Sequence, residues 1–127
     1  MWDDINLSDL VGKEIVKVKG LEARSDEVEF TFKCGDKLLM LHMQDCCEHV
    51  EIVDVCGSVD DLIGSPLTLF EEVSEETTDL EHEYGTWTFY KIATVNGYVD
   101  IRWLGTSNGY YSEKVDLQYE SKNGGSI

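Results

Sequence analysis

The stretch from Gly85 to Tyr111, GTWTFYKIATVNGYVDIRWLGTSNGYY, limits the fold of this chain more than any other part of the sequence. Two runs rich in β-branched and aromatic residues flank the dipeptide Asn96-Gly97. This dipeptide is the strongest short-range signal for a type I′ hairpin, because both turn residues must then adopt positive φ. The pattern therefore predicts a long antiparallel hairpin with Asn96 and Gly97 as its two-residue turn.

Side chains alternate across a strand, so this hairpin has two chemically different faces. We expect the bulky face to build the core, with these pairs: Tyr90 with Trp103, Ile92 with Ile101, and Thr94 with Val99. The opposite face carries the polar groups, with these pairs: Phe89 with Leu104, Lys91 with Arg102, Ala93 with Asp100, and Val95 with Tyr98.

The remaining segments predict further strands and two helical turns. Helical turns are expected at Asn6 to Gly12 and, capped by Ser58, at Ser58 to Gly64. Strands are expected over 13–21, 28–33, 37–43, 49–55, 67–73 and 110–119, in addition to the hairpin. We therefore predict a single mainly β domain over residues 1–127, an antiparallel β-sandwich or partly open barrel. The competing architecture is a strongly bent sheet whose open face is covered by a second copy, as a homodimer.

An acidic run precedes the hairpin. The segment Glu71 to Glu83 has seven carboxylates in thirteen residues and few apolar ones. Such a segment buries too little apolar surface to order itself, so we expect a mobile acidic loop over about residues 74–84. The tail, residues 121–127, is expected to fray.

The net charge excludes some classes of partner. The chain has 26 Asp and Glu against 10 Lys and Arg, which gives a formal charge of −16. This excess argues against direct binding of nucleic acid or of an anionic membrane, and it favours a basic protein surface as partner. We find neither a basic leader followed by an apolar stretch nor a membrane-length apolar run. We therefore expect a cytoplasmic protein whose four cysteines are free thiols.

One short segment, His42 to His49 (HMQDCCEH), concentrates side chains that can bind metals. A structural zinc site needs four converging donors, usually as two pairs separated by a longer loop, and here all of them lie on one turn. A cysteine nucleophile, Cys46 or Cys47 with His42 or His49, is a second alternative that no surrounding motif supports. We favour a tight strand connection in which Asp45 caps backbone donors. We predict no metal, no cofactor and no catalytic residue, and hence no enzyme.

The polar face of the hairpin is a second candidate site. Like charges directly opposite one another repel, so Lys91 and Arg102 need an anion or a carboxylate between them. A functional interpretation is an anion or nucleotide pocket in which Arg102 donates to the anion and Tyr98 or Tyr111 stacks. We favour the structural interpretation, in which both cations pair with acidic neighbours on other strands.

The acid excess is the third candidate feature. Carboxylates spread along the chain could imitate the phosphates of a duplex and occupy a basic nucleic-acid-binding surface, with fast and salt-sensitive association. The simpler alternative is a soluble acidic protein without such a role. The carboxylates considered are Asp26, Glu27, Glu29, Asp45, Glu48, Glu51, Asp54, Asp60, Asp61 and the run from Glu71 to Glu83.

Four segments of the chain resemble a family of small uncharacterised proteins encoded by tailed phages and prophages. They are HMQDCCEH (42–49), VDDLIGSPL (59–67), TWTFYKIATVNGYVDIRW (86–103) and SNGYYSEKVD (107–116). The resemblance covers most of the chain beyond about residue 10 and implies a phage gene product made in a bacterial cytoplasm. It implies no catalytic residue. The acidic segment before Thr86 departs from the family pattern, so a role for that segment would not extend to relatives.

Two functions follow as hypotheses. The first is a non-enzymatic acidic binding protein, a phage accessory or anti-defence factor that blocks a basic, nucleic-acid-binding host protein. The alternative is a small-molecule or nucleotide-binding module that sequesters a signal on the face of Lys91, Tyr98 and Arg102. The residues predicted to bind a partner or ligand are Lys91, Tyr98, Asp100, Arg102, Asn108, Tyr111, Asp45, Glu48, Asp60 and Asp61.

Overall fold

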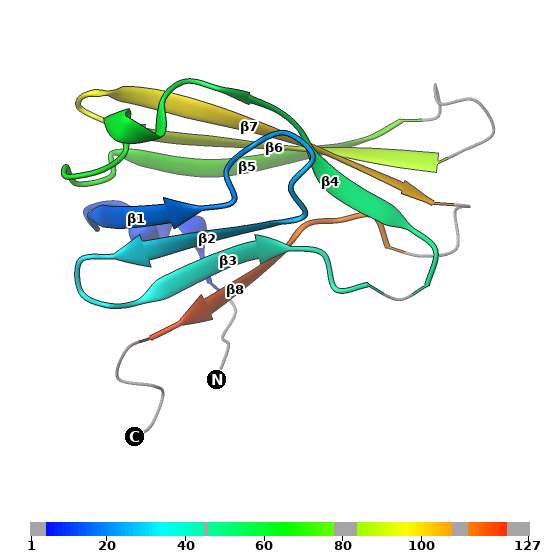
Figure 1. Ribbon diagram of the computed structural model, residues 1–127, viewed down its shortest axis with the longest axis horizontal. Helices are drawn as coiled ribbons and strands as arrows, with labels where there is room; N and C mark the ends of the chain where they lie inside the picture. The colour runs from blue at the N-terminus through cyan, green and yellow to red at the C-terminus, as the bar shows by residue number, and fades with distance from the viewer. Residues whose placement is uncertain (1–4, 45, 78–83, 108–111, 122–127) are drawn as a thin grey trace.

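Two four-stranded antiparallel sheets lie face to face in the computed structural model (Figure 1). The structure describes residues 5–44, 46–77, 84–107 and 112–121. The first sheet has the order β1-β2-β3-β8, and the second has the order β4-β7-β6-β5. The strands are β1 (Ile15–Lys19), β2 (Glu27–Phe32), β3 (Lys37–Leu41), β4 (His49–Cys56), β5 (Leu69–Thr77), β6 (Tyr84–Thr94), β7 (Gly97–Ser107) and β8 (Asp116–Glu120). The predicted antiparallel β-sandwich is confirmed.

Two short 3₁₀ turns complete the described secondary structure, as predicted. The first, η1 (Leu7–Leu10), is capped by Asn6, whose side-chain oxygen accepts a hydrogen bond from the backbone N–H of Ser8 at 3.2 Å. In the second, η2 (Val59–Asp61), the Ser58 hydroxyl accepts from the backbone N–H of Asp60 at 3.3 Å. No helix in the described ranges has the length and apolar composition that crossing a membrane requires.

The hairpin of β6 and β7 forms the centre of the second sheet, but its turn lies one residue earlier than predicted. Thr94 pairs with Gly97, so Val95 and Asn96 form the turn. Neither turn residue has a positive φ, and Gly97 instead takes φ 151° directly after the turn. A β-branched residue such as Val95 strongly disfavours positive φ, so the type I′ turn is excluded.

Moving the turn by one residue shifts the strand pairing by two positions. Each side chain therefore keeps its predicted face and meets a different partner. Lys91 faces Asp100 instead of Arg102, and Arg102 faces Phe89. The predicted division into a buried and an outward face is confirmed, whereas the predicted pairs were wrong.

The core lies between the two sheets. Phe30 of the first sheet packs edge-on against Phe70 of the second, with ring centroids 6.1 Å apart, and Phe70 in turn contacts Tyr90. Burying large aromatic and aliphatic side chains supplies most of the folding free energy of such a sandwich. The largest fully buried side chains are Trp103, Tyr90, Phe30, Phe32, Leu10, Ile15, Leu38, Met40, Ile52, Leu62, Leu67 and Ile92.

The acidic run differs from its prediction. β5 extends through Thr77, so residues 74–77 are strand and not the start of a mobile loop. They pair with residues 85–88 of β6. Residues 78–83 and the tail at 122–127 lie outside the described residues. The strand predicted over 110–119 begins only at Asp116.

Gly57 lets the chain leave β4 while remaining close to β7. It has φ +109°, and a Cβ at this position would lie 2.4 Å from the backbone carbonyl oxygen of Tyr98. Both the dihedral and the lack of space therefore require glycine here. Gly64 offers a matched comparison, because it has φ +90° but no atom within 4 Å of a Cβ built on it.

We predict that Gly57→Ala lowers the free energy of unfolding by more than about 2 kcal/mol, because strain and a backbone clash add. Gly64→Ala should cost only about 1 kcal/mol, since it carries the dihedral strain alone. Urea unfolding followed by circular dichroism measures both. Equal losses for the two variants would show that the close approach to Tyr98 is unimportant.

Candidate functional site

The solvent side of the second sheet, called the outer face below, gathers four of the ten residues that the sequence predicted to bind a partner or ligand. Strand pairing arranges them in rows that run across β4, β7, β6 and β5. The three central rows are Glu51–Leu104–Trp87–Glu75, Asp54–Arg102–Phe89–Val73 and Cys56–Asp100–Lys91–Glu71. The outer face thus combines apolar and aromatic groups in the middle with carboxylates on both edge strands.

Arg102 is held by a carboxylate and an aromatic ring. Its Nη2 lies 3.7 Å from Oδ2 of Asp54 on β4, and its guanidinium carbon lies 5.4 Å from the ring centroid of Trp87. The Trp87 ring stacks on Phe89, with centroids 6.3 Å apart and an interplanar angle of 20°. Arg102 therefore pairs with an acidic neighbour on another strand, as the structural interpretation predicted.

Lys91 lies between two carboxylates. Asp100 on β7 and Glu71 on β5 are its direct cross-strand neighbours, and its Nζ lies 5.0 Å from the ring centroid of Tyr98. The repulsion between Lys91 and Arg102 that we predicted does not occur, because the observed register separates them. Opposite charges directly across a sheet stabilise it by a few tenths of a kcal/mol.

A hollow of about 410 Å³ opens in the outer face. Val73 and Phe89 contribute apolar surface to it. Its charged lining consists of three carboxylates and two cations: Asp54, Glu71, Asp100, Lys91 and Arg102. Since carboxylates outnumber cations, this lining favours a cationic group over an anionic nucleotide.

Cys56 at the rim of this hollow is held as a thiol. Its Sγ donates a weak hydrogen bond to Oδ2 of Asp54 at 3.6 Å. The negative charge of Asp54 raises the pKa of the Cys56 thiol, this hydrogen bond raises it further, and Arg102 only partly opposes the change. Because the thiolate is the nucleophile, Cys56 is disfavoured as a reactive cysteine.

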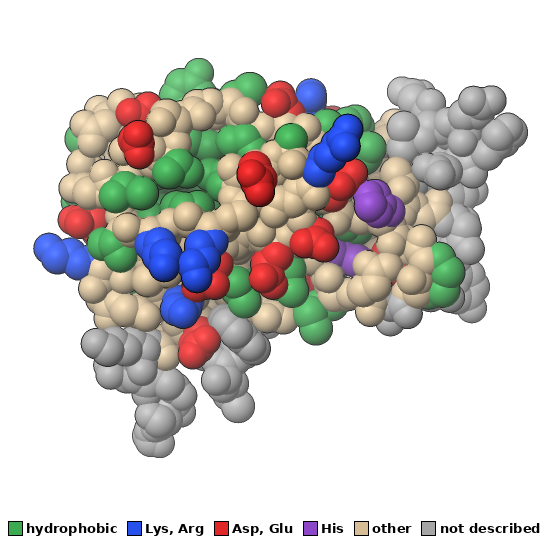
Figure 2. All heavy atoms as spheres, viewed as in Figure 1, with side chains coloured by type: hydrophobic (Ala, Val, Ile, Leu, Met, Phe, Trp, Pro, Cys, Tyr) green, Lys and Arg blue, Asp and Glu red, His purple; other side chains and the backbone are tan. Residues whose placement is uncertain are grey.

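The charges of the chain are divided between the two sheets. Residues 48–107, which supply the second sheet, hold thirteen of the 26 carboxylates but only two of the ten Lys and Arg residues. On the view in Figure 2, the basic side chains gather mainly over the first sheet. The strands of the second sheet hold seven carboxylates and two cations, against four carboxylates and three cations in the strands of the first.

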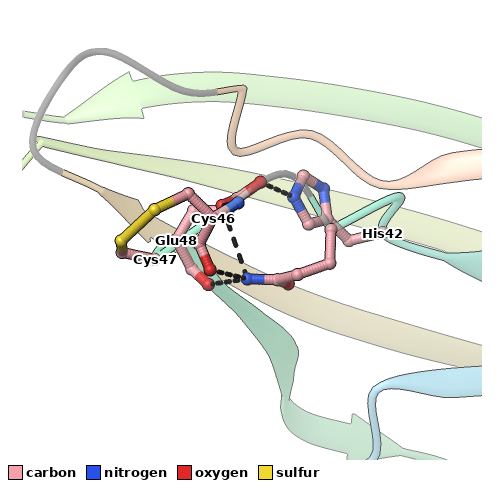
Figure 3. Close-up of a disulfide and its surroundings, with 5 residues drawn as sticks. His42, Cys46, Cys47 and Glu48 are labelled. Atoms are coloured by element: carbon pink, nitrogen blue, oxygen red, sulfur yellow. Dashed lines mark hydrogen bonds and ion pairs between the residues drawn. A yellow bond between two sulfur atoms is a disulfide. The ribbon is translucent and has the colours of Figure 1, made fainter.

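The turn before β4 contains a buried pair of His42 and Glu48. Nε2 of His42 lies 2.7 Å from Oε2 of Glu48 (Figure 3). Nδ1 of His42 lies 2.8 Å from the carbonyl oxygen of Lys114. The carbonyl of Lys114 only accepts hydrogen bonds, so Nδ1 donates to it, and Nε2 faces the carboxyl group of Glu48. The other oxygen of Glu48 accepts the backbone N–H of Cys46 at 2.8 Å. This pair fastens the turn to the segment before β8.

The two adjacent cysteines in this turn are joined as a disulfide (Figure 3). The expectation that Cys46 and Cys47 are free thiols is therefore corrected, whereas Cys34 and Cys56 are free. Disulfide sulfurs are neither thiolate ligands nor nucleophiles. Within the described ranges, no group of three or more His, Cys, Asp or Glu side chains is arranged to hold a metal ion.

The structure places the predicted binding residues in three groups. Four of them share the outer face: Lys91, Tyr98, Asp100 and Arg102. Asp60 and Asp61 lie on η2 beside the hairpin tip, where the Thr94 hydroxyl donates to the carbonyl oxygen of Asp61. Glu48 was wrongly expected at the surface, since its side chain is completely buried against His42. The remaining three, Asp45, Asn108 and Tyr111, lie outside the described residues.

The phosphate-like carboxylates are divided between the two sheets, although Asp26, Glu27 and Glu51 line one hollow together. Glu27 and Glu29 lie on β2 of the first sheet, whereas Glu51 and Asp54 lie on β4 of the second. Sequence analysis also missed Trp87, Val73 and Glu75 as members of the outer face. The alternation Glu71, Val73, Glu75 could have revealed them, if the acidic run had been interpreted as a strand.

The buried pair yields a stability prediction. Removing either partner leaves the other polar group buried without this contact, so His42→Leu and Glu48→Leu should each lower the free energy of unfolding by about 2 kcal/mol or more. The double variant should cost less than the sum of the single ones by at least about 1 kcal/mol. A double-mutant cycle in urea measures this coupling, and strictly additive losses would contradict the pairing of His42 with Glu48.

The Asp54–Cys56 contact yields a reactivity prediction. A raised pKa leaves less thiolate at a given pH, so removing the charge in Asp54→Asn should lower the pKa of Cys56 and speed its alkylation by iodoacetamide at pH 8. The rate-against-pH curve should move to lower pH. Cys34 in the same molecule is the internal control, because it lies in the turn between β2 and β3 of the first sheet. An unchanged alkylation rate of Cys56 in Asp54→Asn would show that Asp54 does not raise the pKa of this thiol.

Comparison with curated proteins and with solved structures finds no match for this chain. A family model described as a domain of unknown function, DUF7448, matches residues 8–117. The matched segment includes both sheets up to the first residues of β8. The chain therefore belongs to the DUF7448 family of uncharacterised domains.

Proposed function

We propose that this protein is a non-enzymatic acidic binding protein that occupies a basic, nucleic-acid-binding surface of another protein. The observation that supports the proposal is the imbalance of charge over residues 48–107, with thirteen carboxylates and two cations. Both cations already lie beside carboxylates of the outer face. The negative potential that remains attracts a basic surface and repels nucleic acid.

The setting of the proposal is a phage infection. The segments 42–49, 59–67, 86–103 and 107–116 resemble small phage and prophage proteins, and an anti-defence factor made in the bacterial cytoplasm would meet many basic nucleic-acid-binding proteins. A protein that competes with a duplex for such a surface inhibits without any chemistry of its own. No step of the proposal requires a cofactor or a catalytic residue.

A nucleotide-binding function on the same face is the weaker alternative. Lys91 has carboxylate neighbours on both adjacent strands, and Arg102 is paired with Asp54. An anionic ligand would have to displace these carboxylates or lie beside them, at a cost in Coulomb energy.

The proposal predicts salt-sensitive capture of basic proteins. The immobilised protein should retain nucleic-acid-binding proteins from a bacterial lysate at about 50 mM salt and release them by about 300 mM, since screening weakens exposed charge contacts. Added duplex DNA should displace the same proteins at low salt, because it competes for their basic surface.

Retention that is unchanged across this salt range, or captured proteins that DNA does not displace, would contradict the proposal. A nucleotide panel provides the comparison with the alternative function. A rise in melting temperature with an anionic nucleotide that Arg102→Ala abolishes would favour the nucleotide-binding module instead.

A further inference from the structure

We infer that the outer face of the second sheet is the docking surface and that it binds arginine side chains of the basic partner. The inference rests on the proposed function. It adds where on this protein the partner binds and which side chains of the partner are bound.

The outer face exposes apolar and aromatic surface that no other part of the described chain covers. Val73 and Tyr98 are both 55% exposed, and the rings of Trp87 and Phe89 are half-buried. On an antiparallel sheet, one face normally packs on the core and the other is polar. A solvent-facing group of aromatic residues surrounded by carboxylates is typical of a protein-binding surface.

The face already contains the contact that we assign to the partner. The guanidinium of Arg102 lies over the Trp87 ring, and the ammonium of Lys91 lies over the Tyr98 ring. A cation over an aromatic ring gains about 0.5–2 kcal/mol, more as water is excluded. The stacked Trp87 and Phe89 rings therefore have the chemistry to hold further cations.

The hollow selects the type of cation. Asp54, Glu71 and Asp100 line it beside the Phe89 ring. A guanidinium can stack on a ring while its in-plane N–H groups reach carboxylates at the side, and a lysine ammonium cannot do both. This geometry points to arginine.

The acidic edge strand argues for a basic partner over a second copy of the chain. β5 lies at the edge of the second sheet and carries Glu71, Glu72, Glu75 and Glu76. Pairing of this edge with itself would bring many like charges together, which is destabilising. A partner segment rich in arginine meets complementary charge along the edge and on the outer face.

The experiment compares two variants that remove the same number of charges. Glu71→Gln with Asp100→Asn neutralises the outer face, whereas Glu22→Gln with Glu27→Gln neutralises exposed carboxylates at the first sheet and serves as control. The probes are a peptide with six arginines spaced by serine, its lysine counterpart, and spermidine. Fluorescence anisotropy at low salt measures the affinity of each peptide, and spermidine is tested as a competitor.

We expect the outer-face variant to bind the arginine peptide about tenfold more weakly, and the control variant to change by less than about twofold. The lysine peptide should bind more weakly than the arginine peptide. In a Trp2→Phe background, binding should change the fluorescence of Trp87, and Trp87→Phe should abolish that change because Trp103 is fully buried.

If both variants lost the same affinity for the arginine peptide, the outer face would not be the docking surface. The charge-based function would still stand. Equal affinity for the two peptides would overturn the choice of arginine. Displacement of the arginine peptide by equimolar spermidine would overturn a protein partner in favour of a polyamine. If the unmodified protein bound neither peptide, both this inference and the proposed function would fail.

Discussion

The pairing of β6 with β7 is the constraint on which the rest of the structure depends. Each strand has eleven residues, and the two are paired along their whole length. Strict alternation then sends Tyr90, Ile92 and Trp103 into the core and sends Lys91 and Arg102 outward. The same register that fills the core thus builds the outer face, and a slip by one residue would destroy both.

Side-chain hydrogen bonds hold both ends of this hairpin. At the tip, the Thr94 hydroxyl donates to the carbonyl oxygen of Asp61, which brings η2 against the turn. At the other end, the hydroxyls of Thr86 and Ser107 donate to the carboxylate of Glu113. A sheet fixed at both ends presents its outer face in one arrangement, which lowers the entropic cost of binding.

The sequence predicted the fold class well, because the hydrophobic alternation and the turn residues that carry it act locally. It misplaced the hairpin turn, because the Asn96-Gly97 signal takes no account of how β6 and β7 must fit between their neighbouring strands. It misassigned residues 74–77, because their acidic composition concealed an alternation that pairing with β6 makes stable.

The candidate site was predicted only in part, for a related reason. Lys91, Tyr98, Asp100 and Arg102 share a face through local alternation, which the sequence displays. The contributions of Asp54, Glu71 and Val73 come from β4 and β5, and only the strand order places them beside the hairpin. The burial of Glu48 depends on His42 and on the distant carbonyl of Lys114, a contact that no local pattern encodes.

Backbone amide NMR of the protein titrated with the arginine peptide tests the central claim most directly, because it locates the bound segment on the fold. The account predicts chemical-shift changes concentrated in β5, β6, β7 and the Asp54–Cys56 end of β4. Changes concentrated on the first sheet, or spread evenly over both, would contradict it.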